Sequence, residues 1–390
     1  MKPAQLKRLQ QLLACPTAPF REMLVVKEVE RQLQSSGIAY FFDPHGNIVV
    51  GAATEKSYKK ILSQRSKEPV RVFIAHMDHP GFHGIRWLSP TRLSVKWFGG
   101  TPKKHINGSK VWLASDEGFL INGIIRKSVL RKDKRAIDTS EVVIEASVNK
   151  DKKISATKLF GGFDFRKPVW SSGKRIYTRA ADDLGGVFAI IETAKLMRNK
   201  PKNAKLPAFI GLLTRGEEVG FVGAVAHLEL GWLNAAVRPV VAVSLEASRT
   251  LPGAIIGKGP VVRLGDWRTV FDPDGLKVLS DLALKLLANK FQRRVMDGGS
   301  CEATAMTAWG IKTIGISLPL GNYHNEGYEG GMDCLNPCGP APEFVHLDDI
   351  EGELKLCAGL MKAGLNWGNP WQQQRDRLRK NLKVYQRYLS

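Results

Sequence analysis

Acidic residues and histidines occur at five separate places along this chain, and their types suit the binding of divalent metal ions. They are His76-Met77-Asp78-His79, Asp182-Asp183, Glu217-Glu218, Glu246 and Tyr323-His324-Asn325. Carboxylate oxygens and neutral imidazoles are good ligands for Zn, Co and Mn. Each place alone is weak evidence, because a Glu-Glu pair usually faces solvent and a lone His usually makes an ordinary hydrogen bond. Only a fold that brings the five together would make a metal site.

The elements that precede these residues predict that they do meet. Short apolar runs of the buried-strand type cover residues 70–75, 208–213, 240–245 and 313–317, and helical patterns cover 184–198, 221–230 and 276–287. Strands alternating with helices predict a three-layer α/β fold, with a mostly parallel sheet and helices on both faces. The carboxyl ends of parallel strands lie at one edge, where ligand sites form. Carboxylates gathered there would repel one another unless cations neutralised them.

Two of the five places suggest particular roles. Asp182 precedes the helix expected at 184–198, where the positive end of the helix dipole favours a negative charge. It is a candidate for the carboxylate that bridges two metal ions about 3.5–4 Å apart. Glu217 and Glu218 are adjacent and leave their strand in different directions. One can bind metal while the other serves as the general base toward an activated water.

The region from about residue 84 to 164 has a different pattern. Short β-rich pieces at 92–98, 110–113, 120–125 and 141–146 alternate with Gly, Asn, Asp and Lys turns, and no long helical pattern appears. We expect a small inserted all-β, barrel-like domain at 84–164. The catalytic domain would then consist of two parts, 1–83 and 165–390. Helices at 4–13 and 22–33 and strands at 39–42 and 48–50 are expected in the first part, and a basic tail ends the second.

With these motifs in order, the chain resembles the tetrahedral (TET) type of cytoplasmic metallo-aminopeptidases, relatives of glutamyl aminopeptidase within the co-catalytic zinc exopeptidase clan. The family's His-Met-Asp-Glu and Leu-Asp-Asp-Arg-x-Gly motifs are similar to His76–His79 and Ala181–Gly186. Its remaining motifs are similar to four further segments, namely Glu217–Ala224, Val243–Glu246, Pro252-Gly253 with Gly257–Pro260, and Tyr323–Asn325. The similarity in order and spacing extends over nearly the whole chain, the β insert included.

The resemblance implies a zinc exopeptidase-like fold, a dimerisation-type β insert and two divalent metal ions per subunit. Zinc is the first expectation, with cobalt or manganese as alternatives. One metal would be held by His76, Asp182 and Glu246, and the other by Asp182, Glu218 and His324. Glu217 would be the general base, and Asp78 would orient His76. The implied substrates are peptides, and the implied assembly is a homo-oligomer, either a dimer or a larger hollow cage.

Three places depart from the family's motifs. His79 replaces a Glu, Leu184 replaces the Arg after the double Asp, and Gly298-Gly299-Ser300-Cys301-Glu302 replaces Gly-Gly-Thr-Asp. The last lies where the family shapes its substrate pocket, so the side-chain preference does not carry over.

The same residues are compatible with other functions. The clan uses a similar site to cleave N-acyl amino acids, so an amidohydrolase or deacylase is the nearest alternative. A catalytically silent basic scaffold is a second. Cys301 as a nucleophile would need a neighbouring base, which the sequence does not mark. Cys334 and Cys338 lack a second Cys/His pair at zinc-finger spacing and are expected to be loop thiols.

Composition restricts the surroundings in which the chain works. The polar start lacks the apolar core of a signal peptide, no stretch approaches the roughly 18 apolar residues of a membrane helix, and five irregularly spaced Cys do not form a disulfide framework. We therefore expect a cytoplasmic protein with no membrane partner. The formal net charge of +21 favours anionic partners. No nucleic-acid-binding motif accompanies the charge, so nucleic acid is not expected as a partner.

Overall fold

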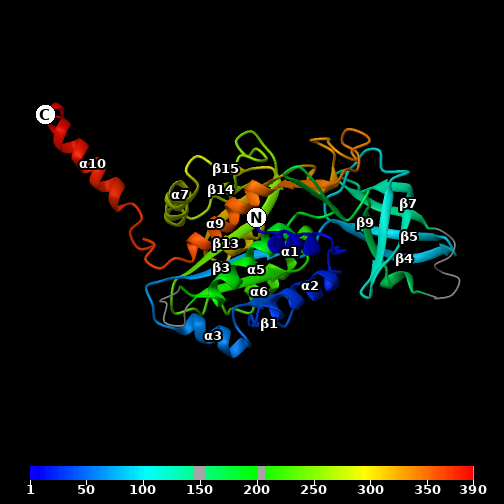
Figure 1. Ribbon diagram of the computed structural model, residues 1–390, viewed down its shortest axis with the longest axis horizontal. Helices are drawn as coiled ribbons and strands as arrows, with labels where there is room; N and C mark the ends of the chain where they lie inside the picture. The colour runs from blue at the N-terminus through cyan, green and yellow to red at the C-terminus, as the bar shows by residue number, and fades with distance from the viewer. Residues whose placement is uncertain (145–153, 201–206, 390) are drawn as a thin grey trace.

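The computed structural model describes residues 1–144, 154–200 and 207–389. Their largest sheet has eight strands in the order β1-β2-β12-β3-β13-β16-β14-β15 (Figure 1). The strands are β1 (Tyr40–Phe42), β2 (Ile48–Val50), β3 (Val70–His76), β12 (Phe209–Thr214), β13 (Val240–Arg249), β14 (Val261–Asp266), β15 (Gln292–Met296) and β16 (Lys312–Leu320). The four central strands, β12, β3, β13 and β16, are parallel, as predicted. Antiparallel pairs occur toward both edges, where β2 joins β12 and β14 joins β16.

Helices cover both faces of this sheet because alternate side chains of each strand point to opposite faces. In β3, Phe73 and Ala75 belong to one buried cluster, whereas Val72 and Ile74 belong to another. The first cluster packs under α1 (Pro3–Leu13), α2 (Met23–Gln34), α5 (Leu184–Arg198), α7 (Pro273–Leu287) and α9 (Leu347–Leu360). The second packs under α3 (Glu55–Ser63), α6 (Val222–Glu229) and α8 (Glu302–Ala308). The predicted three-layer α/β fold is confirmed.

Six strands form a closed barrel beside the sheet (Figure 1). They are β4 (Gly81–Ser89), β5 (Arg92–Phe98), β6 (Lys110–Ser115), β7 (Gly118–Leu130), β8 (Ile137–Ile144) and β9 (Phe160–Phe163). The barrel has a core of its own, in which the Trp97 ring lies 5.0 Å from Phe82 and 4.9 Å from Phe163. The predicted inserted β-barrel is confirmed. The end of the strand expected at 141–146 falls outside the described residues.

A second, three-stranded sheet is formed by β10 (Val169–Ser172), β11 (Arg175–Thr178) and β17 (Glu343–His346). In this sheet, β10 follows the last barrel strand, β11 precedes α5, and β17 follows the loop after β16. The chain ends in α10 (Gln372–Tyr385), which leaves the body and points into solvent (Figure 1). Within the described residues, no helix has the length and apolar character to cross a membrane.

Candidate metal centre

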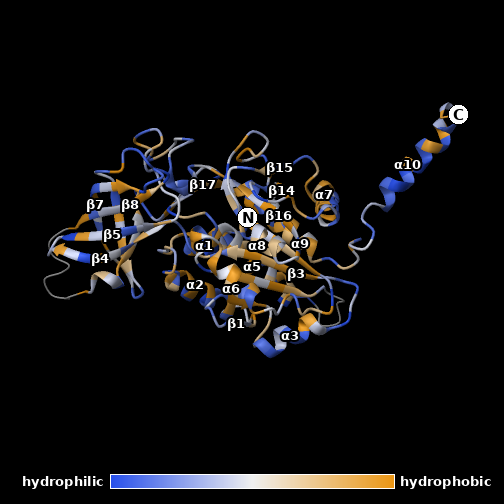
Figure 2. Ribbon diagram, turned by 180° about the vertical axis from the view of Figure 1, so that it is seen from behind, coloured by the Kyte–Doolittle hydropathy of each residue, from blue (hydrophilic) through white to orange (hydrophobic). Residues whose placement is uncertain are grey.

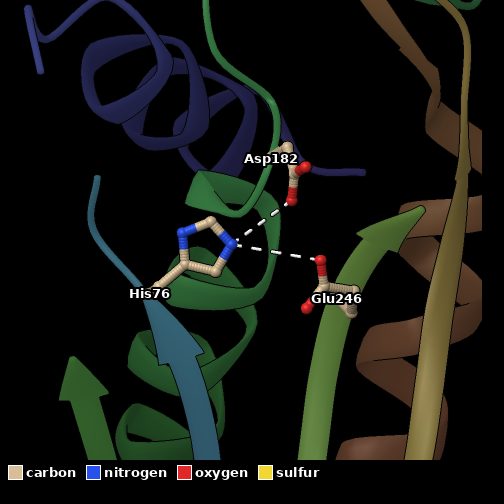
Figure 3. Close-up of side chains that lie close together, drawn as sticks. All are labelled: His76, Asp182 and Glu246. Atoms are coloured by element: carbon tan, nitrogen blue, oxygen red, sulfur yellow. Dashed lines mark ion pairs between the residues drawn. The ribbon is translucent and has the colours of Figure 1, made fainter. Parts of the chain in front are cut away.

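His76 and Glu246 lie side by side at the carboxyl end of the parallel strands. His76 is the last residue of β3, and Glu246 lies within β13. The parallel register pairs Val240 with Val70, so six residues further along each strand Glu246 comes level with His76. His76 Nε2 is 4.0 Å from Glu246 Oε1 and 3.4 Å from Asp182 Oδ1 (Figure 3). All three side chains are buried.

Asp182 reaches this cluster from the turn that begins α5. Its neighbour Asp183 is the N-cap and accepts a hydrogen bond from the Gly186 amide at 3.1 Å. A Cβ on Gly186 would lie 2.3 Å from Asp183 Oδ2, so a glycine is required for the turn to pack this closely. The peptide bond between the two aspartates is cis. The expected start of the helix directly after Asp182-Asp183 is confirmed.

Glu217 and Glu218 occupy a tight 3-10 turn, η2 (Glu217–Val219), directly after β12. Asp78 holds this turn, because its two carboxylate oxygens accept hydrogen bonds from the Glu217 amide at 2.9 Å and the Glu218 amide at 3.1 Å. The Asp78 carbonyl oxygen lies 3.1 Å from His76 Nδ1. Asp78 therefore connects the end of β3 to both glutamates. The sequence led us to expect only that it orients His76.

His324 follows β16 in the 3-10 turn η3 (Tyr323–Asn325), where its backbone is left-handed at φ 55°. Its Nε2 lies 3.1 Å from Glu218 Oε2 and 3.6 Å from Asp182 Oδ2. The barrel domain contributes to this corner, since a Cβ on Gly100 would lie 2.3 Å from His324 Nδ1. A glycine after β5 thus lets the loop pass directly over the imidazole.

Burial and mutual repulsion alter the pKa values of this cluster strongly. Burial raises the pKa of Glu217 well above its usual range, and burial together with the charge of Asp182 raises that of Glu246 to about 8. Burial acts in the same direction on Asp182, but His324 and His76 outweigh it and lower its pKa. The pKa of His324 rises to about 10, because Glu218 and Asp182 outweigh the opposing effect of burial. The cluster is therefore a strongly negative environment that favours bound cations.

The donor atoms fit a pair of metal ions. Among the described residues, five buried polar atoms of the cluster have no hydrogen-bond partner: His76 Nε2, Asp182 Oδ1, Glu218 Oε1, Glu246 Oε2 and His324 Nε2. Leaving such groups unpaired is costly unless they bind a ligand. Two triads, His76–Asp182–Glu246 and Asp182–Glu218–His324, each bring their ligand atoms within 4.8 Å of one another, and they share Asp182. His76, Glu217 and Glu218 form a third such group.

Glu343 is a residue of this site that the sequence did not mark. It is fully buried at the start of β17 and accepts hydrogen bonds from the amides of Ala181 at 2.6 Å, Asp182 at 3.2 Å and His324 at 2.9 Å. One carboxylate thereby fixes the backbone of two candidate ligands. Glu343 follows His324 by 19 residues across a loop, so no local spacing reveals it.

The departures from the motifs lie around the cluster. His79 Nδ1 lies 3.0 Å from the Asp182 carbonyl oxygen, and its Nε2 lies 3.3 Å from Asn325 Oδ1, so His79 lies between the segments of two candidate ligands. Glu302 is buried and bonds to Thr214 at the end of β12.

The cysteines do not form a second site. Cys301 is buried, and burial raises the pKa of its thiol, which argues against a role as nucleophile. Among the described residues, no metal-ligand triad includes a cysteine.

A small cavity adjoins the cluster on the side of Glu246 and Tyr323. Two arginines line it. Arg263 is buried and bonds to Ser248 Oγ at 2.9 Å, and the Arg249 guanidinium lies 3.7 Å from the centre of the Tyr328 ring. A much larger cavity, about 880 Å³, lies between α1, α2 and the barrel. It holds none of the candidate ligands, so the chemistry belongs to the cluster and not to this larger space.

Comparison with known proteins agrees with this geometry. The model of the M42 glutamyl aminopeptidase family matches residues 59–329, and the chain belongs to that family. It is a metallo-aminopeptidase within the co-catalytic zinc exopeptidase clan, as the motifs predicted. No curated protein sequence matches the chain.

Solved structures share the fold over almost the whole chain at low sequence identity. The Pyrococcus horikoshii TET1 peptidase, which can assemble into a tetrahedron or a large octahedral shell, is 22% identical with a TM-score of 0.69 and covers 92% of this chain and 100% of its own. The aminopeptidase APDkam598 from the archaeon Desulfurococcus kamchatkensis is 21% identical with a TM-score of 0.70, covering 93% and 96%. The TET aminopeptidase from Thaumarchaeota archaeon SCGC AB-539-E09 is 18% identical with a TM-score of 0.70, covering 92% and 97%.

Proposed function

We propose that this metallo-aminopeptidase removes N-terminal residues from peptides with two divalent metal ions per subunit. The observation that carries the proposal is that five residues, each with a buried polar atom that lacks a hydrogen-bond partner, form two triads that share Asp182. A scaffold without catalytic function would gain nothing from keeping five buried polar atoms without hydrogen-bond partners in one cluster.

His76, Asp182 and Glu246 would hold one ion, and Asp182, Glu218 and His324 the other. Carboxylates and imidazoles without thiolates suit zinc first, with cobalt or manganese as alternatives. When bound, the ions would supply Lewis-acid activation of the scissile carbonyl and of a water molecule. The shared carboxylate of Asp182 would fix the distance between the two positions.

Glu217 would act as the general base. Its Oε2 lies 3.9 Å from His76 Nε2, and it belongs to neither of the two triads that share Asp182. Burial raises the pKa of its carboxyl group, which suits a group that takes a proton from water and passes it to the leaving amine. Asp78 would position both glutamates by accepting their amide hydrogens.

The assembly and location also belong to this proposal. A homo-oligomer, either a dimer or a larger cage, is supported by the TET1 peptidase of the same fold. The cytoplasm is supported by the five free cysteines. The domain boundaries at 83/84 and 164/165 are proposed on the sequence pattern.

The purified protein should be tested on aminoacyl-anilides and on N-acyl amino acids, with its metal content measured in the same sample. We expect cleavage of substrates with a free amino group and two metal equivalents per chain. Cleavage of N-acyl compounds alone would favour the deacylase reading. Inactive, metal-free protein after addition of Zn, Co or Mn would contradict both.

A further inference from the structure

The helix α10 is a surface of the molecule that the peptidase site does not use. None of its residues, Gln372–Tyr385, is buried. Just before it, Trp371 donates a hydrogen bond from Nε1 to Asp274 Oδ1 of α7 at 2.9 Å, which anchors the base of the helix to the body. The helix beyond this anchor extends away from the sheet and from the barrel (Figure 1).

One side of α10 is apolar. Leu378, Leu382 and Tyr385 are spaced by four and three residues, so they lie on the same face of the helix. Their exposed fractions are 55%, 50% and 61%. Leu389, which follows the helix, is 79% exposed. Figure 2 shows apolar and polar colours alternating along this helix. A stripe of this kind in water points to a partner with an apolar component.

The rest of the helix is strongly cationic. Its charged residues are Arg375, Arg377, Arg379, Lys380 and Lys383 against the single acid Asp376. Arg375, Arg379 and Lys383 follow one another at intervals of four and form a ridge beside the apolar stripe. Asp376 lies 3.4 Å from Arg379, whereas Arg377, Lys380 and Lys383 make no ion pair with any described residue.

We propose that α10 binds an anionic lipid surface, lying along it with the apolar stripe at the boundary between headgroups and acyl chains. An amphipathic helix with basic residues beside an apolar face is the form that binds in this plane, and anionic lipids attract its cations. A lipid surface of this kind would cover the apolar stripe and also attract the basic residues beside it. The binding is peripheral, so it requires no spanning helix, and it differs from the expectation of no membrane partner that was drawn from the sequence.

The two competing partners each leave one side of the helix unexplained. A nucleic acid would neutralise the cations but would leave Leu378, Leu382 and Tyr385 in water. A second copy of the chain could cover the stripe with its own α10, but this would bring two sets of five cations together.

The test is flotation of the full-length enzyme with vesicles of phosphatidylcholine alone and of phosphatidylcholine with phosphatidylglycerol. We expect binding to the anionic vesicles to be at least about ten-fold stronger, and added salt to weaken it. The double variant Lys380→Gln/Lys383→Gln should lose most of this binding because it removes two cations. The double variant Leu378→Gln/Leu382→Gln should also lose this binding, because it removes most of the apolar stripe. It leaves the charge unchanged and should leave the helix intact, since Gln has a helix propensity close to that of Leu.

Gln373→Ser is the matched control, because Gln373 is exposed on α10 and belongs to neither the stripe nor the ridge. All variants should keep wild-type activity on a small peptide. Equal binding to both vesicle types, or none, would overturn the proposal. So would a change of oligomer mass in the leucine variant without vesicle binding, which would make the stripe a protein–protein surface. Loss of binding to an RNA oligonucleotide in the lysine variant, again without vesicle binding, would assign the helix to nucleic acid.

Discussion

The cluster of candidate metal ligands and α10 both concentrate charged side chains, but they do so in opposite ways. The cluster gathers its residues from five distant segments and buries most of them, so that five polar atoms have no hydrogen-bond partner among the described residues. In α10 the charges come from one continuous segment and all remain exposed. Water solvates the charges of α10, whereas the mostly buried charges of the cluster favour cations as partners. Substitutions should therefore have large effects on activity in the first region and none in the second.

The largest effect is expected from removal of a candidate ligand. In His76→Ala and His324→Ala, one metal position loses its imidazole, so metal occupancy and peptidase activity should fall together, the activity by more than about 100-fold. Elemental analysis of each variant beside its activity assay measures both quantities. His45→Ala is the control, because this imidazole is exposed in the turn before β2. Full metal content in either variant would remove that histidine from the ligand set.

A smaller effect is expected at Glu343, which contacts ligand backbones and would not itself bind metal. Glu343→Gln keeps the size of the side chain but weakens its bonds to the amides of Asp182 and His324. We expect metal affinity to fall by about 10–100-fold, with activity recovering at high metal concentration. Competition with a metal chelator measures the affinity. Glu229→Gln, at an exposed position of α6, should change nothing, and an equal loss in both variants would show that the effect is not specific to the site.

The smallest effect concerns the basic surface around the site. The net charge of +21 and the arginines beside Glu246 should raise the local concentration of peptides that begin with Glu or Asp. The ratio of activity on Glu-anilide to that on Leu-anilide should rise, by about ten-fold or less, as salt is lowered, because 0.1 M salt screens charges beyond about 10 Å. Poor activity on acidic substrates at every salt concentration would count against this expectation.

The sequence predicted the cluster because each candidate ligand except Asp182 follows a short apolar run that forms a buried strand. The runs before His76, Glu217 and His324 and that around Glu246 became β3, β12, β16 and β13. Parallel pairing of these strands is enough to bring their carboxyl ends to one edge of the sheet. The contacts of Glu343 with Asp182 and of Asp78 with Glu217 could not be predicted, because each joins a carboxylate to a backbone amide more than a hundred residues away. The strands β14 and β15, the last two at one side of the sheet, also escaped prediction, since Arg263, Arg293 and Arg294 interrupt their apolar pattern.

In the proposed mechanism Glu218 binds metal whereas Glu217 moves the proton, and substitution of each by Gln separates these two roles. Metal content and turnover should be determined for Glu217→Gln and Glu218→Gln side by side. Glu217→Gln should keep both metals and lose a factor of about 10²–10⁴ or more in turnover, because an amide cannot accept the proton. Glu218→Gln should lose metal and recover partly when metal is added. Near-normal turnover in Glu217→Gln with its metals bound would contradict the account, and reversed phenotypes would exchange the two roles.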